Sequence, residues 1–327
     1  IISMLERKEP ELAMYLAKRL AGACVVLWAI ITITFGLMHA IPGGPFTQEK
    51  KLPPAVMATV EARYHLDEPL WSQYVDYVRH AAVLDLGPSY KYPGKTVNDI
   101  IAETFPVSAQ LGLISLFLAI GAGVLAGMAA AWYKNTWIDY TMMVGATLGV
   151  SVPSFILAAV LIQLFAFTWP ILPAALWKGP AYVVLPALAL AAQPTAFIMR
   201  LTRSSLLDAL GQDYIRTVRS RGIGTRSLIC HHALRNALLP VVSYIGPLAA
   251  ALMTGSFIVE TIFAIPGLGR HFVTSIYNRD YTVILGITIF YSFLIMMMNL
   301  LIDVIYPLLD PRITMDGKKE GLSLIHI

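Results

Sequence analysis

The side chains best suited to binding chemistry are the arginines of segment 200–235, which holds seven arginines and two aspartates. The arginine guanidinium is permanently charged, and its planar fork pairs with carboxylates and phosphates. Such a segment can bind an acidic protein surface, or it can bind anionic lipid and orient a membrane protein. The residues alone leave both alternatives open. The spacing of Arg216 and Arg219 predicts that both lie on one face of a helix.

No motif predicts an enzyme or a bound nucleotide. The Gly-Lys-Thr run at 94–96 lacks the earlier glycine of a P-loop, because Ser89 stands at that position. His231 and His232 have no cysteine or carboxylate at ligand spacing, and adjacent residues on a helix point about 100° apart. The sequence contains neither Gly-x-Ser-x-Gly nor His-Glu-x-x-His. We therefore predict a protein that is not an enzyme and has no catalytic residues, cofactor or metal ion.

The arginines lie between segments that are apolar enough to cross a membrane. The chain is 57% hydrophobic and 13% charged, whereas soluble domains are about 25% charged. A helix needs about 20 apolar residues to span the hydrocarbon core. Six segments of at least this length carry no Asp, Glu, Lys or Arg: Leu20–Gln48, Thr104–Tyr133, Tyr140–Trp177, Gly179–Met199, Asn236–Val259 and Tyr281–Ile302. The sequence therefore predicts an all-α integral membrane protein with six transmembrane helices.

The distribution of lysine and arginine predicts the orientation of these helices. Cytoplasmic loops carry an excess of both residues. Segment 200–235 has seven basic and two acidic residues, and four basic residues precede the apolar run that begins at Leu20. Segment 49–103 has six basic and eight acidic residues, as a translocated segment tolerates. We expect both termini and the arginine segment to be cytoplasmic. Orientation alone explains the net charge of +4, so no nucleic-acid partner is needed.

These features divide the chain into five parts. They are a cytoplasmic leader (1–14), a first transmembrane helix (15–41), an external segment (42–104), a five-helix core (105–309) that includes a cytoplasmic loop (204–238), and a cytoplasmic tail (310–327). Residues 321–327 resemble the translation of a sequencing-library adapter, and we assign them no role. We expect short external helices at 53–65 and 70–83. Pro153 predicts a kink in the third helix, at 138–168.

Three residues are candidates for lining a translocation path through the membrane, namely Ser151, Pro153 and Glu260. A carboxylate in or near a span is costly and usually faces protein or water. Glu260 therefore has two interpretations. It either marks a helix end at the outer interface near Arg270, or it faces the path.

At the arginine segment the sequence resembles the permease subunits of ATP-binding-cassette importers, in their peptide-transporting branch. The run Asp-Tyr-Ile-Arg-Thr-Val-Arg-Ser-Arg-Gly at 213–222 and the run His-Ala-Leu-Arg-Asn-Ala-Leu-Leu-Pro at 232–240 are similar to the coupling loop of that branch. The general motif is Glu-Ala-Ala, a glycine and a Leu-Pro. Here Gly222 and Pro240 match, whereas Arg-Thr-Val at 216–218 replaces Glu-Ala-Ala. Both this replacement and the separation of 18 positions between Gly222 and Pro240 are typical of the peptide branch.

The resemblance extends over about 14–313 and includes the motifs at 41–45, 105–109, 260–269, 278–281 and 310–313. The external stretch 52–66 is most similar to the B-type subunit of oligopeptide permeases. The resemblance implies a type I importer permease fold, also called MetI-like, in a bacterial inner membrane. It assigns contact with an ATPase to Asp213, Arg216, Arg219, Arg221, Gly222, Arg226, Arg235 and Pro240.

The resemblance also implies partners. They are a homologous C-type permease subunit, two cytoplasmic ATPases that use the ATP, an external peptide-binding protein, an oligopeptide substrate and the lipid bilayer. Two alternatives stay open at this stage. One is an importer of dipeptides, nickel or another small solute. The other is a different class of protein, an ion-coupled secondary transporter or a lipid-binding scaffold, although charged residues in mid-span and inverted repeats are not evident.

Overall fold

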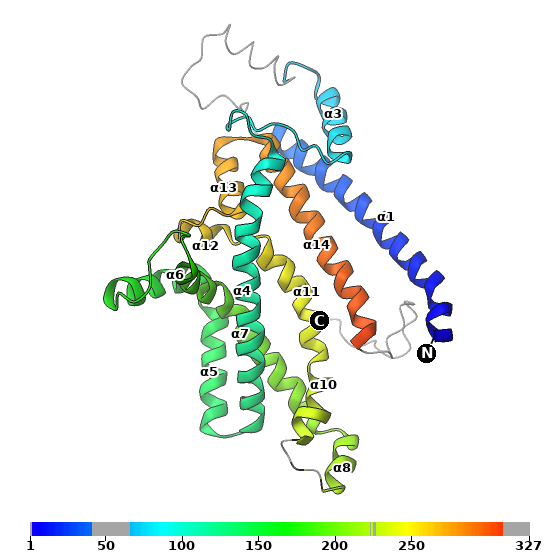
Figure 1. Ribbon diagram of the computed structural model, residues 1–327, viewed down its shortest axis with the longest axis vertical. Coiled ribbons are helices and arrows are strands. Elements are labelled where there is room, and N and C mark those ends of the chain that lie inside the picture. The colour runs from blue at the N-terminus through cyan, green and yellow to red at the C-terminus, as the bar shows by residue number, and fades with distance from the viewer. Residues whose placement is uncertain (1, 41–65, 223, 225–226, 310–327) are drawn as a thin grey trace.

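The computed structural model describes residues 2–40, 66–222, 224 and 227–309, and these residues fold as a bundle of helices (Figure 1). Five helical runs are long and apolar enough to cross a membrane: Arg19–Ala40, Val97–Trp132, Pro180–Leu210, Leu234–Ile262 and Tyr281–Leu301. A sharply bent pair of helices at 137–168 makes a sixth candidate. The prediction of an all-α integral membrane protein is confirmed. The predicted helix at 53–65, the tail from 310 and Arg226 lie outside the described residues.

Helix α4 (Val97–Trp132) begins earlier than the apolar pattern indicates, because Thr96 caps it. The Thr96 hydroxyl accepts from the Asp99 N–H at 3.1 Å, and the Asp99 carboxylate accepts from the Thr96 N–H at 3.0 Å. This capping box satisfies two of the free donors at a helix start. The Gly-Lys-Thr run therefore leads into a helix cap, and Lys95 forms an ion pair with Glu103.

Helices α4 and α7 (Pro180–Leu210) form the central pair of the bundle (Figure 1). Gly123 and Gly127 lie one turn apart on α4, and each faces α7 so closely that a methyl group would overlap its neighbours. At Gly123 that methyl group would lie 2.8 Å from Ile198, and at Gly127 it would lie 2.7 Å from Thr202. Lipid offers no hydrophobic driving force between helices, so small residues that allow close backbone contact hold such pairs together.

The third predicted helix bends at Pro153, where a kink was predicted, but the bend is sharp enough to divide it into two helices. Helix α5 (Trp137–Ser151) and helix α6 (Ser154–Ile162), which a π-helical turn η1 (Gln163–Thr168) extends, meet at an angle of 104°. In Figure 1, α6 runs sideways from the end of α5. Pro153 has no N–H and leaves carbonyls without an intrahelical donor. Gln193 of α7 supplies one, because its Nε2 lies 3.4 Å from the Val150 carbonyl and 3.3 Å from the Val152 carbonyl.

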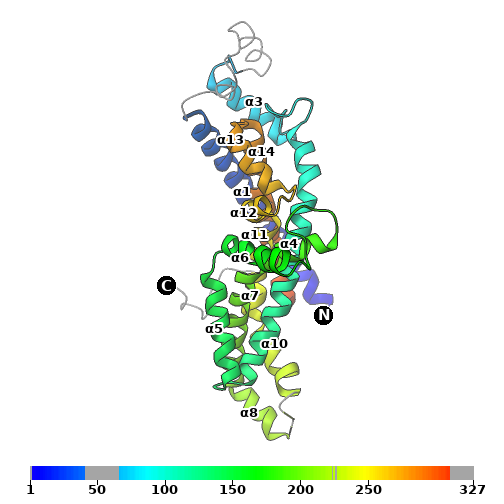
Figure 2. The same ribbon diagram turned by 90° about the vertical axis from the view of Figure 1, so that its left-hand side faces the viewer.

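The fifth predicted helix is also interrupted. It consists of α11 (Leu239–Met253) and α12 (Phe257–Ile262), separated at Gly255, which has φ +85°. Helix α13 (Leu268–Asn278) follows, and α14 (Tyr281–Leu309) ends the described chain. The remaining long helix, α1 (Ile2–Ala40), packs beside α14. Figure 2 shows α3 (Leu70–Ala82) and α13 at one end of the molecule and α8 (Asp213–Ser220) at the other.

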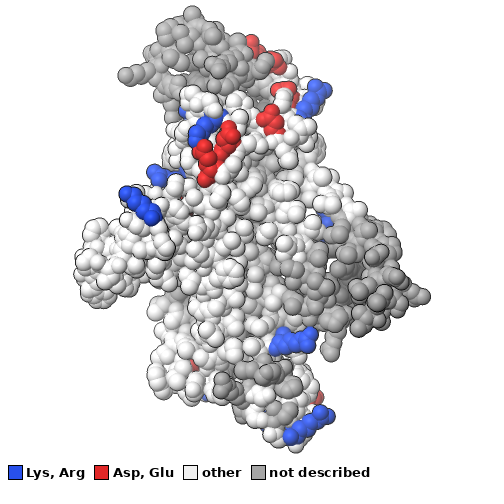
Figure 3. Space-filling model, viewed as in Figure 1, with Lys and Arg blue, Asp and Glu red and all other residues white. Residues whose placement is uncertain are grey.

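The charged side chains lie mainly at these two ends. On the face shown in Figure 3, acidic and basic residues gather together at the α3 end and basic residues dominate the α8 end, with an almost uncharged girdle between them. The girdle exposes large apolar side chains such as Phe117, Leu125 and Val144. Exposure of so many apolar side chains fits a surface that contacts lipid or other membrane helices.

Candidate functional site

Helix α8 presents the arginines of the coupling-loop motif. Arg216, Arg219 and Arg221 are all exposed. Arg216 lies 3.6 Å from Asp213, but both side chains are largely solvated, so this pair contributes little to stability. Arg219 and Arg221 form no ion pair with any other described residue. The guanidinium groups of this helix are therefore available to a partner.

The opposite face of α8 is anchored in the bundle by apolar contacts. Ile215 is 1% exposed and packs with Leu206 of α7 and with Leu228 and Ala233 of the π-helical turn η2 (Leu228–Ala233). Tyr214 accepts a hydrogen bond from Asn236 of α10 (Leu234–Ala237) at 3.0 Å. The sequence signal for this anchor is the apolar spacing of Ile215 and Val218, opposite the arginines.

Gly222 ends α8 with φ +80°. A methyl group added at Gly222 would meet no described atom within 4 Å. The glycine is therefore required for its backbone conformation and not for close packing, because residues with a Cβ rarely adopt positive φ. Arg235 and Pro240 are exposed on the returning chain, at α10 and at the start of α11. The structure thus brings the described residues of this motif to one end of the bundle.

An ion pair that the sequence did not reveal lies just inside this end. Arg203 of α7 donates two hydrogen bonds to the carboxylate of Asp139 on α5, from Nε at 2.6 Å and from an Nη at 2.7 Å. Asp139 also accepts from the Asn135 N–H at 2.9 Å. The Asp139 side chain is 2% exposed and that of Arg203 is 22% exposed. The only sequence signal was an arginine and an aspartate that each stand near the end of an apolar run.

Glu260 lies in the protein interior and not on a path-facing surface. Its residue is 0% exposed. The carboxylate accepts from the Ser108 hydroxyl at 2.7 Å and from the Arg270 N–H at 2.9 Å. The Ser108 oxygen in turn accepts from the Leu268 N–H at 2.8 Å. The interpretation that places Glu260 near Arg270 fits this geometry. The contact is made by the Arg270 backbone N–H in the protein interior, and not by exposed side chains at the outer interface of the membrane.

Glycines surround the Glu260 carboxylate. A methyl group at Gly255 or Gly267 would overlap both the carboxylate and the Ser108 hydroxyl, and one at Gly269 would lie 3.1 Å from the carboxylate. These glycines let the backbone approach the buried carboxyl group closely enough to donate to it. The motif at 260–269 therefore joins α4, α12 and α13 into one packed unit.

The other two path candidates lie together at the α5–α6 bend. Ser151 is exposed, and its hydroxyl donates to the Thr147 carbonyl at 2.8 Å. Pro153 is half-buried at the bend itself. Gln193 is exposed beside them on α7. The bend therefore offers the polar groups of Ser151 and Gln193 on an otherwise apolar surface, and Glu260 is not part of it.

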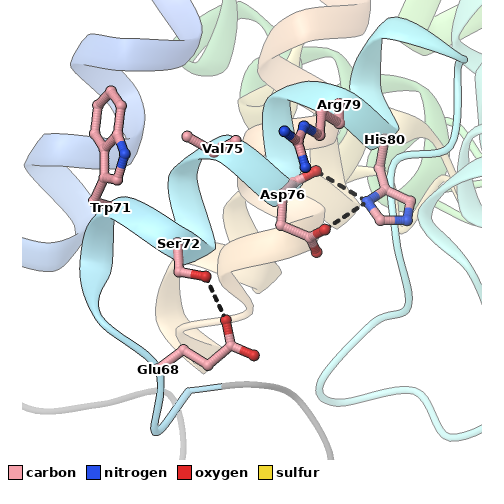
Figure 4. A pocket seen from close by; sticks show the side chains of 7 residues that line it. All are labelled: Glu68, Trp71, Ser72, Val75, Asp76, Arg79 and His80. Atoms are coloured by element: carbon pink, nitrogen blue, oxygen red, sulfur yellow. Dashed lines mark hydrogen bonds and ion pairs between the residues drawn. The ribbon is translucent and has the colours of Figure 1, made fainter.

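At the opposite end, α3 carries a shallow surface depression of about 490 Å³ with acidic and basic groups around it (Figure 4). Ser72 donates to Glu68 at 2.6 Å, and the His80 ring lies 3.5 Å from the Asp76 carboxylate. The Asp76 backbone carbonyl and then its carboxylate raise the pKa of His80. No group of three His, Cys, Asp or Glu side chains in the described part of the chain is arranged to hold a metal ion.

Comparison with known proteins assigns the family. Residues 123–315 match the model of the binding-protein-dependent transport system inner membrane component, and residues 12–112 match the model of the N-terminal part of such membrane components. The chain is 47% identical to the dipeptide transport system permease protein DppB of Bacillus subtilis, over 94% of this chain and 100% of that protein. It is 44% identical to the oligopeptide transport system permease protein OppB of Salmonella typhimurium, over 91% of this chain and 98% of that protein.

The fold is similar to a solved one. A chain of the MetNI methionine ABC transporter, in an inward-facing conformation, superposes with a TM-score of 0.54 at 17% identity. The match covers 64% of this chain and 96% of that chain. The prediction of a MetI-like fold is confirmed. The chain therefore belongs to the family of binding-protein-dependent transport system inner membrane components, and it is a multi-pass permease subunit of an ATP-binding-cassette importer and not an enzyme.

Proposed function

We propose that this subunit forms half of a translocation path for peptides and receives the energy of ATP hydrolysis through α8. The observation that carries the proposal is the two-sided character of α8. Its arginine face is exposed, while Ile215 fixes its other face to α7 and to the returning chain. A helix built in this way can accept a push from a partner and pass it on as a rigid-body movement. The ATPase-contact residues are Asp213, Arg216, Arg219, Arg221, Gly222, Arg226, Arg235 and Pro240.

The proposed orientation places the α8 end in the cytoplasm. Its arginines support this, because cytoplasmic loops are rich in arginine and lysine. Both termini then lie in the cytoplasm, and the segment between α1 and α4 lies outside. The depression on α3, with Glu68 and Asp76 on its rim, would then face an external partner (Figure 4).

The proposed partners follow from what one subunit lacks. A single chain with five or six spanning helices is small for enclosing an aqueous path of peptide width. We therefore propose a homologous C-type permease subunit, two cytoplasmic ATPases and an external peptide-binding protein. The ATPases, and not this chain, would bind and hydrolyse the ATP.

The proposed substrate class is oligopeptides. Relatives named for oligopeptide and for dipeptide transport both match along almost the whole chain, at 44% and 47% identity. Peptide transport is common to the names of both relatives. We propose that the path itself is weakly selective and that the binding protein selects the peptide.

The proposed path passes the α5–α6 bend. Ser151 and Gln193 provide polar side chains there, and the backbone is irregular at Pro153. Irregular backbone at membrane depth is tolerated where it faces protein or a water-filled cavity. Glu260 takes no part in lining this path in our proposal. It instead fixes the motif at 260–269 against α4, as its complete burial supports.

Affinity purification of a tagged chain from its own membrane tests the assembly. We expect a second permease subunit and two ATPases to co-purify in mild detergent. A double variant in which Arg219 and Arg221 become Glu should retain the permease partner and lose the ATPases. If this variant loses the permease partner together with the ATPases, or retains all of them, α8 is not the ATPase contact.

A further inference from the structure

This inference rests on the proposed function and concerns how movement of α8 reaches the α5–α6 bend. Helix α5 is attached to α7 near both of its ends. Near its start, Asp139 binds Arg203 through two hydrogen bonds of 2.6 and 2.7 Å. At its far end, Gln193 of α7 binds the carbonyls of Val150 and Val152. Two attachments at separate heights fix both the position and the tilt of one helix against the other.

Small side chains close the interval between the two attachments. A methyl group added to Gly149 of α5 would lie 3.0 Å from the Cβ of Ala196 on α7. Ala146 packs in a buried cluster with Ala196 and Met199 of α7 and with Ala130 of α4. Alanine and glycine have no rotamers that could absorb a shift between the helices. The contact therefore favours movement of α5 and α7 together.

The end of α7 that carries Arg203 is part of the α8 anchor. Leu206 and Ala209, within two turns of Arg203, pack in the same cluster as Ile215 of α8. A force applied to α8 thus acts on α7 directly beside the Arg203 attachment. The route from α8 to the bend is continuous: α8, the end of α7, Arg203, Asp139 and α5.

The ion pair is strong enough to matter in this route. The Asp139 side chain is 2% exposed, and it has three donors, two from Arg203 and one from the Asn135 N–H. Removal of Arg203 would leave the buried Asp139 charge uncompensated, which destabilises a protein. A surface pair such as Asp213 with Arg216 has no such consequence.

We propose that Asp139, Arg203 and Gln193 are positioning residues for energy coupling. They hold α5 and α6 to α7, so that the bend at Pro153 moves whenever α8 is displaced. In this role Asp139 and Arg203 touch neither the peptide nor the ATPase, whereas Gln193 also lies on the proposed path. Loss of the ion pair should therefore leave ATP hydrolysis intact and disconnect it from transport.

The test uses the complete assembly in proteoliposomes and measures peptide taken up per ATP hydrolysed. Asp139→Asn and Arg203→Gln should each lower this ratio by about tenfold, within the range typical of coupling between sites. Asp139→Glu and the exchanged pair Asp139→Arg with Arg203→Asp should recover most of the ratio, because both keep opposite charges in place. Arg200→Gln removes an exposed arginine one turn away on α7 and should leave the ratio unchanged.

A second measurement separates positioning from stability. Spin labels at Val144 on α5 and Ser204 on α7, both exposed, report the distance between the two helices in a background without Cys24 and Cys230. In the otherwise native chain, the distribution of this distance should be narrow and should not change when ATP binds. In Asp139→Asn, the distribution with ATP bound should be broader.

The outcomes are distinct. If the native assembly shows no ATP-dependent uptake, the proposed function fails. If native uptake is normal and Asp139→Asn keeps both the native uptake per ATP and a sharp distance, then packing alone couples the helices and this inference is overturned. A stable Asp139→Asn assembly that hydrolyses ATP with little uptake would support it.

Discussion

Ser108 and Glu260 stand 152 positions apart in the chain and share a hydrogen bond of 2.7 Å at a site that solvent does not reach. The Ser108 oxygen also accepts from the Leu268 N–H. One hydroxyl thus joins α4 to a buried carboxylate and to the start of α13. The Glu260 motif, whose sequence had two interpretations, is in the structure a point where three helices are fixed together.

Replacement of Ser108 by Ala should destabilise the subunit. The change leaves one carboxylate oxygen and the Leu268 N–H without their partner, and a buried polar group left unpaired costs about 1–3 kcal/mol. Thermal unfolding of the detergent-solubilised chain measures the effect. Thr274→Ala removes a half-buried hydroxyl that bonds only to the Arg270 carbonyl of its own helix, and it serves as the control. Equal stability of the two variants would contradict the role of the buried site.

Replacement of Gly222 by Val should abolish uptake and leave the chain in the membrane, because φ +80° is strained for a β-branched residue. Gly222→Asn should retain more uptake than Gly222→Val, since Asn tolerates positive φ. Gly224 has open space around it and no positive φ, so Gly224→Val is the matched control. The idea fails if the two valine variants transport equally well in vesicles with equal subunit content.

Replacement of Gly127 by Leu should separate α4 from α7. The added side chain would overlap the Met199 carbonyl, which is rigid backbone, and the buried Thr202 side chain. Gly121 lies on the same helix with nothing within 4 Å of a Cβ, so Gly121→Leu tests the same change of volume without the contact. We expect a lower unfolding temperature only for Gly127→Leu. A similar loss in both variants would point to a general intolerance of α4 to large residues.

The sequence predicted the number and type of the long helices because a membrane span needs only length and apolar composition. It also predicted the arginine face of α8 from local spacing. It predicted a kink at Pro153 but not a bend of 104°, since the group that makes so sharp a bend tolerable, Gln193, lies on another helix. The partners of Asp139 and Glu260 lie 64 and 152 positions away, and no periodicity reveals pairs at such separations.

The proposed orientation predicts the labelling of single cysteines in intact cells. Val83→Cys, at the end of α3, should react with a membrane-impermeant thiol reagent, and Thr217→Cys on α8 should react only after the cells are opened. Both positions are exposed. Cys24 and Cys230 are replaced in this background. The reverse labelling pattern would place α8 outside and rule out contact with a cytoplasmic ATPase.

The central claim is tested by uptake of a labelled oligopeptide into proteoliposomes. ATP is supplied on the side of the membrane where the ATPases bind. We predict no uptake with this chain alone, uptake with the second permease, both ATPases and the binding protein, and loss of uptake when Arg219 and Arg221 both become Glu. Peptide uptake by this chain alone, driven by an ion gradient without ATPase subunits, would contradict the account.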